Sequence, residues 1–265
     1  MLFVPLVGPA KAAEASAWDQ GTHSAMRLIA ATARHEGEPT FRAGIEVRLD
    51  PGWKTYWRYP GDSGVPPRID FSRSDNVKTV TVGWPAPHRF SDEGGQSIGY
   101  KEHVIFPLSI TPLDARRPVK LGLDLDYAVC EKLCMPVEAS SELMLAGHEA
   151  SHEAAVAAAE ARVPQRRKLG EASALSILAV HRLAPDRVAV DVSAPEDTGV
   201  DLFAEGPTPE WALPLPEPSG AAPAGVKRFT FALDGLPPGA KAEGAILTLT
   251  AVAGEAAIEV TYRLD

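Results

Sequence analysis

The chain has little basic charge, no long apolar run and almost no cysteine. Its 26 lysines and arginines face 35 aspartates and glutamates, a formal net charge of −9, so the cationic surface that binds nucleic acid is absent. No stretch reaches the roughly 18 apolar residues of a membrane-spanning helix, so the sequence predicts no transmembrane segment. The two cysteines, Cys130 and Cys134, are separated by only three residues.

Glycine and proline are abundant, with 22 and 24 among the 265 residues, which favours a turn-rich β protein. The 45% hydrophobic content is that of a globular chain and excludes global disorder. The length is more than a typical single domain needs and predicts two domains.

The first residues have the pattern of a secretory signal. Met1–Val7 is apolar, and small residues follow at Ala10 and Ala12, as they do before a signal-peptide cleavage site. We therefore expect residues 1–13 to be a partial signal peptide and the protein to be exported to the periplasm. An oxidising compartment allows the close cysteine pair to form a disulfide.

Short strand patterns separated by turn residues fill residues 20–148 and return in residues 171–265, which favours two sandwich or barrel domains. Residues 149–170 are rich in alanine, glutamate and arginine and predict a helical linker. Pro207–Gly225 is rich in proline and alanine, and we expect a mobile loop there.

A half-buried strand leads into the cysteine pair. From Val119 to Val129 apolar residues recur at every second position, so this strand should place Cys130 at its end, on the face opposite Val129. A three-residue turn then brings Cys134 back, and we expect the Cα atoms of the two cysteines roughly 4.4–6.8 Å apart.

Three functions for this pair remain open. As a structural staple, a five-residue ring would contribute only about 2 kcal/mol, which favours chemistry over structure. Thiol–disulfide exchange suits two thiols that can join and part without backbone movement. Cu(I) binding by Cys130, Cys134 and Met135 is the runner-up, and a non-catalytic interaction module with a fixed disulfide is the third.

Three ordered motifs resemble a known family. The segments Gly52–Gly64, Phe90–Tyr100 and Tyr127–Pro136 are similar to the periplasmic N-terminal domain of the DsbD family of thiol:disulfide interchange proteins, in particular its ScsB (suppressor of copper sensitivity) branch. The resemblance covers roughly residues 25–145. It does not extend to the family's transmembrane and C-terminal thioredoxin domains.

The resemblance implies two immunoglobulin-like sandwiches in an all-β fold and a redox-active pair that needs no cofactor. It implies a relay of electrons from a separate membrane protein to periplasmic thioredoxin-fold proteins, so an enzymatic activity would be that of a protein-disulfide reductase. By analogy Cys130 forms the mixed disulfide. A cap loop is implied over the pair, with Phe90 as cap and Asp92 and Glu93 as its acids; Gly94 stands where the family has an aromatic residue.

An aromatic cluster precedes the first glycine-rich turn. Trp53, Tyr56 and Trp57 could line a pocket around the cysteines or could pack in the core, and core packing is the commoner role of such residues. Farther on, His148 and His152 satisfy the HExxH spacing of zinc proteases, but Ala158 stands where a third histidine is required. We therefore expect a solvated segment there and no metal.

Overall fold

The computed structural model describes most of the chain. The described residues are 13–34, 37–61, 64–92, 95–148, 151–196, 198–220, 222 and 225–265. The expected signal peptide therefore lies, except for Ala13, outside the described residues.

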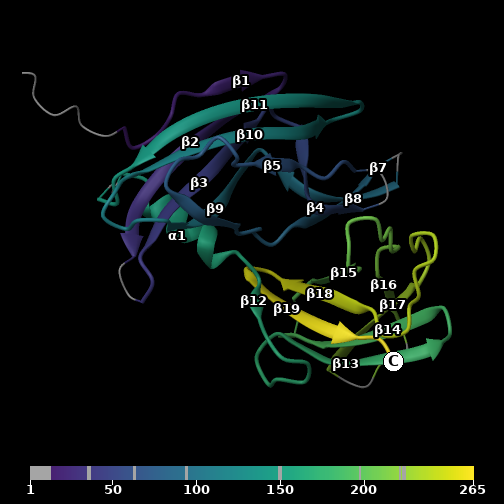
Figure 1. The fold of residues 1–265 in the computed structure, drawn as a ribbon. Helices are drawn as coiled ribbons and strands as arrows, with labels where there is room; N and C mark the ends of the chain where they lie inside the picture. The colour runs from purple at the N-terminus through teal and green to yellow at the C-terminus, as the bar shows by residue number, and fades with distance from the viewer. Residues whose placement is uncertain are drawn as a thin grey trace, which may run out of the picture.

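Two antiparallel sheets form the first sandwich (Figure 1). The first sheet has the strand order β1 (Asp19–Gly21), β2 (Ser24–Arg34), β3 (Thr40–Leu49), β9 (His103–Pro112), β6 (Val77–Val82). The second has the order β11 (Cys134–Leu145), β10 (Val119–Cys130), β4 (Lys54–Gly61), β8 (Gly95–Lys101), β7 (His88–Asp92), with β5 (Arg68–Asp70) also paired to β10. Alternate residues of facing strands, among them Ile45, Trp57 and Leu121, fill the core between the sheets.

A second sandwich follows (Figure 1). Its sheets have the orders β12 (Gln165–Arg166), β19 (Ala256–Arg263), β18 (Ile246–Ala253), β15 (Val200–Glu205), and β13 (Ser176–Ala184), β14 (Arg187–Ser193), β17 (Val226–Ala232), β16 (Glu217–Ser219). A separate core contains Val190, Phe229 and Leu249. The prediction of an all-β fold with sandwich domains is confirmed.

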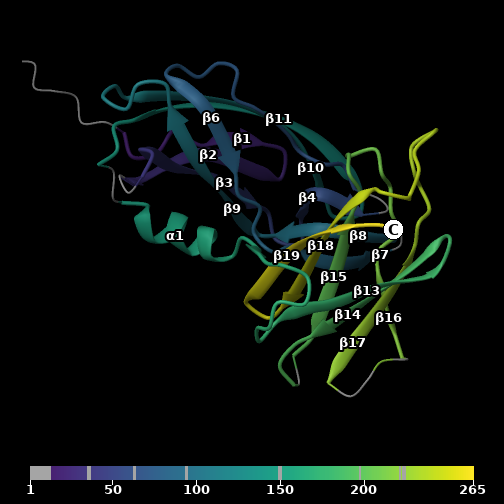
Figure 2. The ribbon, with the colours of Figure 1, turned by 60° about the horizontal axis from the view of Figure 1, so that its bottom comes forward.

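One helix, α1 (Glu153–Ala161), occurs in the described part of the chain and runs along the first sandwich (Figure 2). It buries Val156 against that sandwich, and Arg42 holds both of its ends through Glu153 at 2.6 Å and Glu160 at 2.8 Å. The helix is shorter than the expected linker of residues 149–170. Pro164 lacks an amide proton and follows its end, after which β12 pairs with β19.

Part of the proline-rich segment, which we expected to form a mobile loop, packs between the sandwiches at residues 211–215. Leu213 and Leu215 are buried, and the Tyr59 hydroxyl donates to the Leu213 carbonyl oxygen at 2.5 Å. These contacts join the segment to β4 of the first sandwich.

Charged contacts also join the two sandwiches. Arg58 on β4 donates to Glu205 at 2.7 Å and to Glu259 at 2.6 Å, and both carboxylates are largely buried. Burial alone would lower the pKa of Arg58, but hydrogen bonds and charges from the two carboxylates outweigh it and raise the pKa above its ordinary value. Arg58 therefore stays charged in the interface.

Candidate functional site

The hairpin of β10 and β11 brings the two cysteines together. Cys130 and Cys134 are direct partners in the antiparallel ladder and form a disulfide with a Cα–Cα distance of 4.2 Å. That distance lies slightly below the expected range because the two residues close the hairpin face to face. Val129 packs in the core while Cys130 faces the other side of the sheet, as the alternating pattern predicts.

The two cysteines differ in exposure to solvent. Cys130 is 2% exposed, because β4 pairs with its strand and Tyr56 packs on its side chain. Cys134 is exposed, since it begins β11, the edge strand of the sheet. Leu133 beside it is 79% exposed. A partner from solution therefore reaches Cys134 first.

A buried hydroxyl contacts both sulfurs. The Tyr56 hydroxyl donates to Cys130 Sγ at 2.8 Å and lies 3.2 Å from Cys134 Sγ. The neighbouring backbone comes very close: a Cβ at Gly64 would lie 2.7 Å from the Tyr56 ring, and one at Gly99 would lie 1.9 Å from the Thr55 carbonyl oxygen. Glycine at these two positions lets the chain close around Tyr56.

A lysine lies next to the disulfide on the same face of the sheet. Lys54 is the cross-strand partner of Cys130, is 7% exposed and donates to the Ser97 hydroxyl at 2.9 Å. Sequence reasoning missed both Lys54 and Ser97. Lys54 could have been found, because it lies two residues before Tyr56 on one strand and so shares its face.

The other two aromatic residues lie away from the sulfurs. Trp57 is fully buried in the core and contacts Phe203 of the second sandwich at a ring distance of 5.7 Å. Trp53 stacks on His23 at 3.9 Å. Of the three aromatic residues expected around the pair, the structure brings only Tyr56 to the cysteines.

The expected cap residues are described only in part. Phe90 lies on β7, with its ring 5.8 Å from Lys54 Nζ and 4.8 Å from Lys101 Nζ, and the strands β4 and β8 separate β7 from β10. Asp92 ends β7, and Glu93 lies outside the described residues. The cap and its acids stay a prediction.

The residues considered as metal ligands do not lie together in the structure. Met135 is the ladder partner of Val129 and packs against the core, on the face opposite the disulfide. His148 precedes α1, which starts at Glu153, so the HExxH spacing does not place two imidazoles on one helix face. Among the described residues no group of three histidine, cysteine, aspartate or glutamate side chains could hold a metal ion.

Comparison with known proteins finds a family that resembles the first sandwich. Residues 27–146 match the family model described as the N-terminal part of the thiol:disulfide interchange protein DsbD. The first sandwich is thus similar to a DsbD N-terminal domain over nearly all of its strands. No curated protein matches the chain.

A solved structure is similar to this chain over both sandwiches. The N-terminal periplasmic domain of ScsB from Proteus mirabilis is similar over 95% of this chain and 98% of its own, with a TM-score of 0.73 and 21% sequence identity. At this identity the likeness establishes a shared fold. None of the described helices is long and apolar enough to cross a membrane.

Proposed function

We propose that this protein is a periplasmic thiol–disulfide interchange protein that works through Cys130 and Cys134. The observation that carries the proposal is a disulfide between one exposed and one buried cysteine, in a sandwich that matches the DsbD N-terminal family model. The electron donor is a separate membrane protein, and the acceptor is a periplasmic protein of the thioredoxin fold.

Reduction begins at the exposed sulfur. A donor thiolate attacks Cys134 Sγ, a bond to the donor sulfur forms, and the Cys130–Cys134 bond breaks. Cys130 leaves as a thiolate, and the Tyr56 hydroxyl at 2.8 Å stabilises its charge. The donor's second thiolate then attacks the donor sulfur that is bonded to Cys134 and releases Cys134 as a thiolate. The donor now holds a disulfide, and two electrons have passed to the cysteine pair.

Transfer to the acceptor runs through the same atoms in reverse. The Cys134 thiolate attacks the acceptor disulfide and displaces one acceptor sulfur as a thiolate. Cys130 then attacks Cys134 Sγ, closes the protein's disulfide and releases the second acceptor thiolate. The exposed Leu133 beside Cys134 offers the partner an apolar contact.

The exposure of Cys134 supports assigning the mixed disulfide to this residue, in place of Cys130 as analogy suggested. Single-cysteine variants test the assignment. Cys130→Ser keeps the exposed thiol and lacks the resolving one, so it should accumulate a mixed disulfide with an oxidised thioredoxin-fold protein. Cys134→Ser keeps only the buried thiol and should trap far less, as measured on non-reducing gels.

Two outcomes would contradict the proposal. Trapping mainly by Cys134→Ser would restore Cys130 as the attacking residue. Failure of both variants, with the double serine variant as control, would remove the exchange function and leave the Cu(I) or structural readings. A redox titration adds an independent measure, because a structural bridge should lie below about −300 mV and an exchangeable one above it.

A further inference from the structure

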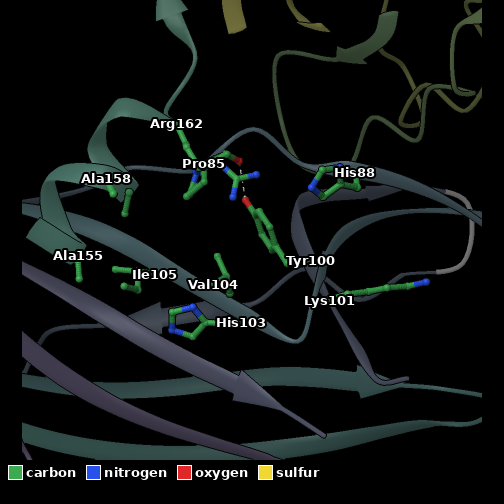
Figure 3. A pocket seen from close by; sticks show the side chains of 11 residues that line it. Pro85, His88, Tyr100, Lys101, His103, Val104, Ile105, Ala155, Ala158 and Arg162 are labelled. Carbon is green, nitrogen blue, oxygen red and sulfur yellow. Dashed lines mark hydrogen bonds between the residues drawn. The ribbon is translucent and has the colours of Figure 1, made fainter. Parts of the chain in front are cut away.

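A pocket lies on the side of the first sandwich, between α1 and the strands β8 and β9 (Figure 3). Its volume is about 320 Å³. Val104 and Ile105 form an apolar floor, and Ala155 and Ala158 face it from the helix. The short alanine side chains leave the space open, and none of these residues contacts the cysteine pair.

The polar part of the pocket is basic. No aspartate or glutamate lines it, although the whole chain has a net charge of −9. Arg162, Lys101, His88 and His103 contribute nitrogen-bearing side chains. Among the described residues the Arg162 guanidinium has no ion-pair partner, whereas His103 lies 3.0 Å from Glu46. A cationic group without a counter-ion thus borders an apolar floor.

Arg162 meets an aromatic ring at one side of the pocket. Arg162 and the Tyr100 ring point toward one another, with Pro85 beside them (Figure 3). The Tyr100 hydroxyl donates to the Pro85 carbonyl oxygen at 2.8 Å, which fixes the ring at the edge of the pocket. Burial and then the charge of Arg162 hold the pKa of His88 below its ordinary value, so His88 is a neutral hydrogen-bonding group at pH 7.

We propose that this pocket binds a carboxylate carried on a compact apolar group. Arg162 can hold both carboxylate oxygens through its planar guanidinium, and the apolar group lies on Val104 and Ile105 opposite Ala158. A cavity of about 150 Å³ holds benzene, so 320 Å³ accommodates a ligand of about a dozen non-hydrogen atoms. The partial negative charge at the end of α1 opposes the anion only weakly, because the carbonyls of Ala159 and Glu160 are already hydrogen-bonded.

Such a ligand has two sources, a small organic acid or the C-terminus of a peptide. The test uses 3-phenylpropionate as probe and the full chain with its disulfide intact, followed by amide chemical shifts in NMR. We expect saturable shifts at Val104, Ile105 and α1, with a dissociation constant of about a millimolar for so small a probe. The neutral 3-phenylpropionamide should bind at least about tenfold more weakly, because the charged hydrogen bonds are lost.

Two variants test the charge of Arg162 and the volume of the pocket separately. Arg162→Gln should weaken binding about tenfold or more, and Ala158→Leu should abolish it by filling the pocket, while Arg68→Gln on the distant β5 should leave it unchanged. Binding of a short peptide that ends in phenylalanine, but not of its C-terminal amide, would identify a peptide terminus as the source. Binding of the acid alone would identify a small organic acid.

The proposal is overturned if 3-phenylpropionate gives no saturable shifts, or if the amide binds as well as the acid. It is also overturned if neither Arg162→Gln nor Ala158→Leu weakens binding. Unchanged amide shifts of β10 and β11, which lie in the same sandwich and contribute no residue to the pocket, serve as the check that each variant is folded.

Discussion

Replacing Tyr56 by phenylalanine removes one oxygen atom from the disulfide site and leaves the ring in place. That oxygen donates to Cys130 Sγ at 2.8 Å, the sulfur that leaves when a partner attacks Cys134. The variant should therefore keep its fold and its disulfide but be reduced more slowly.

The size of the effect follows from the charge on the leaving sulfur. A hydrogen bond to a charged group contributes about 1.5–3 kcal/mol. Roughly half of the thiolate charge has developed in the transition state of the exchange, in line with a Brønsted coefficient of about 0.4–0.5. The barrier should rise by about 0.7–1.5 kcal/mol, which slows reduction by about three- to twelvefold.

The assay is the rate of reduction by a dithiol at fixed pH, followed by stopped-flow fluorescence. Tyr127→Phe is the matched control, because the Tyr127 hydroxyl contacts Ser24 at 2.7 Å on the core side of β10 and not the sulfurs. Equal rates for the wild-type protein and Tyr56→Phe would refute the role of the hydroxyl. An equal slowing by Tyr127→Phe would assign the effect to altered packing instead.

Three further changes test the fold around the site. Arg58→Met leaves the largely buried Glu205 without its cation and leaves Glu259 with only the more distant Arg166 at 3.8 Å. It should lower the stability by about 3 kcal/mol in urea unfolding, whereas an unchanged midpoint would show that the Arg58 ion pairs contribute nothing. Burial raises the pKa of Glu46, but hydrogen bonds from Arg27 and His103 outweigh it and hold the pKa below its ordinary value of 4.5. Its stabilisation is therefore present above that value and lost as the pH falls through the folded-state pKa, so Glu46→Gln should flatten the loss of stability between pH 5 and pH 3, while the exposed Glu38→Gln should not. Reduction of the disulfide should cost at most about 2 kcal/mol and leave the circular dichroism spectrum of the sheets unchanged; unfolding on reduction would make the bridge structural.

The sequence predicts the local geometry of the cysteine hairpin well. Period-two alternation is a property of a single strand, so the pattern from Val119 to Val129 is enough to place Val129 in the core and Cys130 on the opposite face. The same rule could have separated Tyr56 from Trp57, because neighbouring residues on β4 point to opposite faces.

The difference between the two sulfurs is not a local property. Cys130 is buried because Lys54 of β4, more than 70 residues earlier in the chain, pairs with it, while among the described strands β11 pairs with β10 alone. The order of strands in the sheet decides which cysteine a partner reaches, and a single strand pattern carries no information on that order. The packing of residues 207–216 is likewise decided by the other sandwich, since Tyr59 on β4 binds the Leu213 carbonyl.

Strand β4 gives the second sandwich a physical connection to the redox site. Tyr56 points to the sulfurs, the next residue, Trp57, packs against Phe203, and Arg58 pairs with carboxylates of the second sandwich. A strand held by both domains has few alternative positions, so the second sandwich restricts where the Tyr56 hydroxyl can lie. A hydrogen bond to a leaving thiolate stabilises it fully only when its donor is already in place, because no energy is then spent on reorganisation. In the exchange that we propose, the second sandwich would thus act by fixing the strand that carries Tyr56, and none of its described residues hydrogen-bonds to either sulfur.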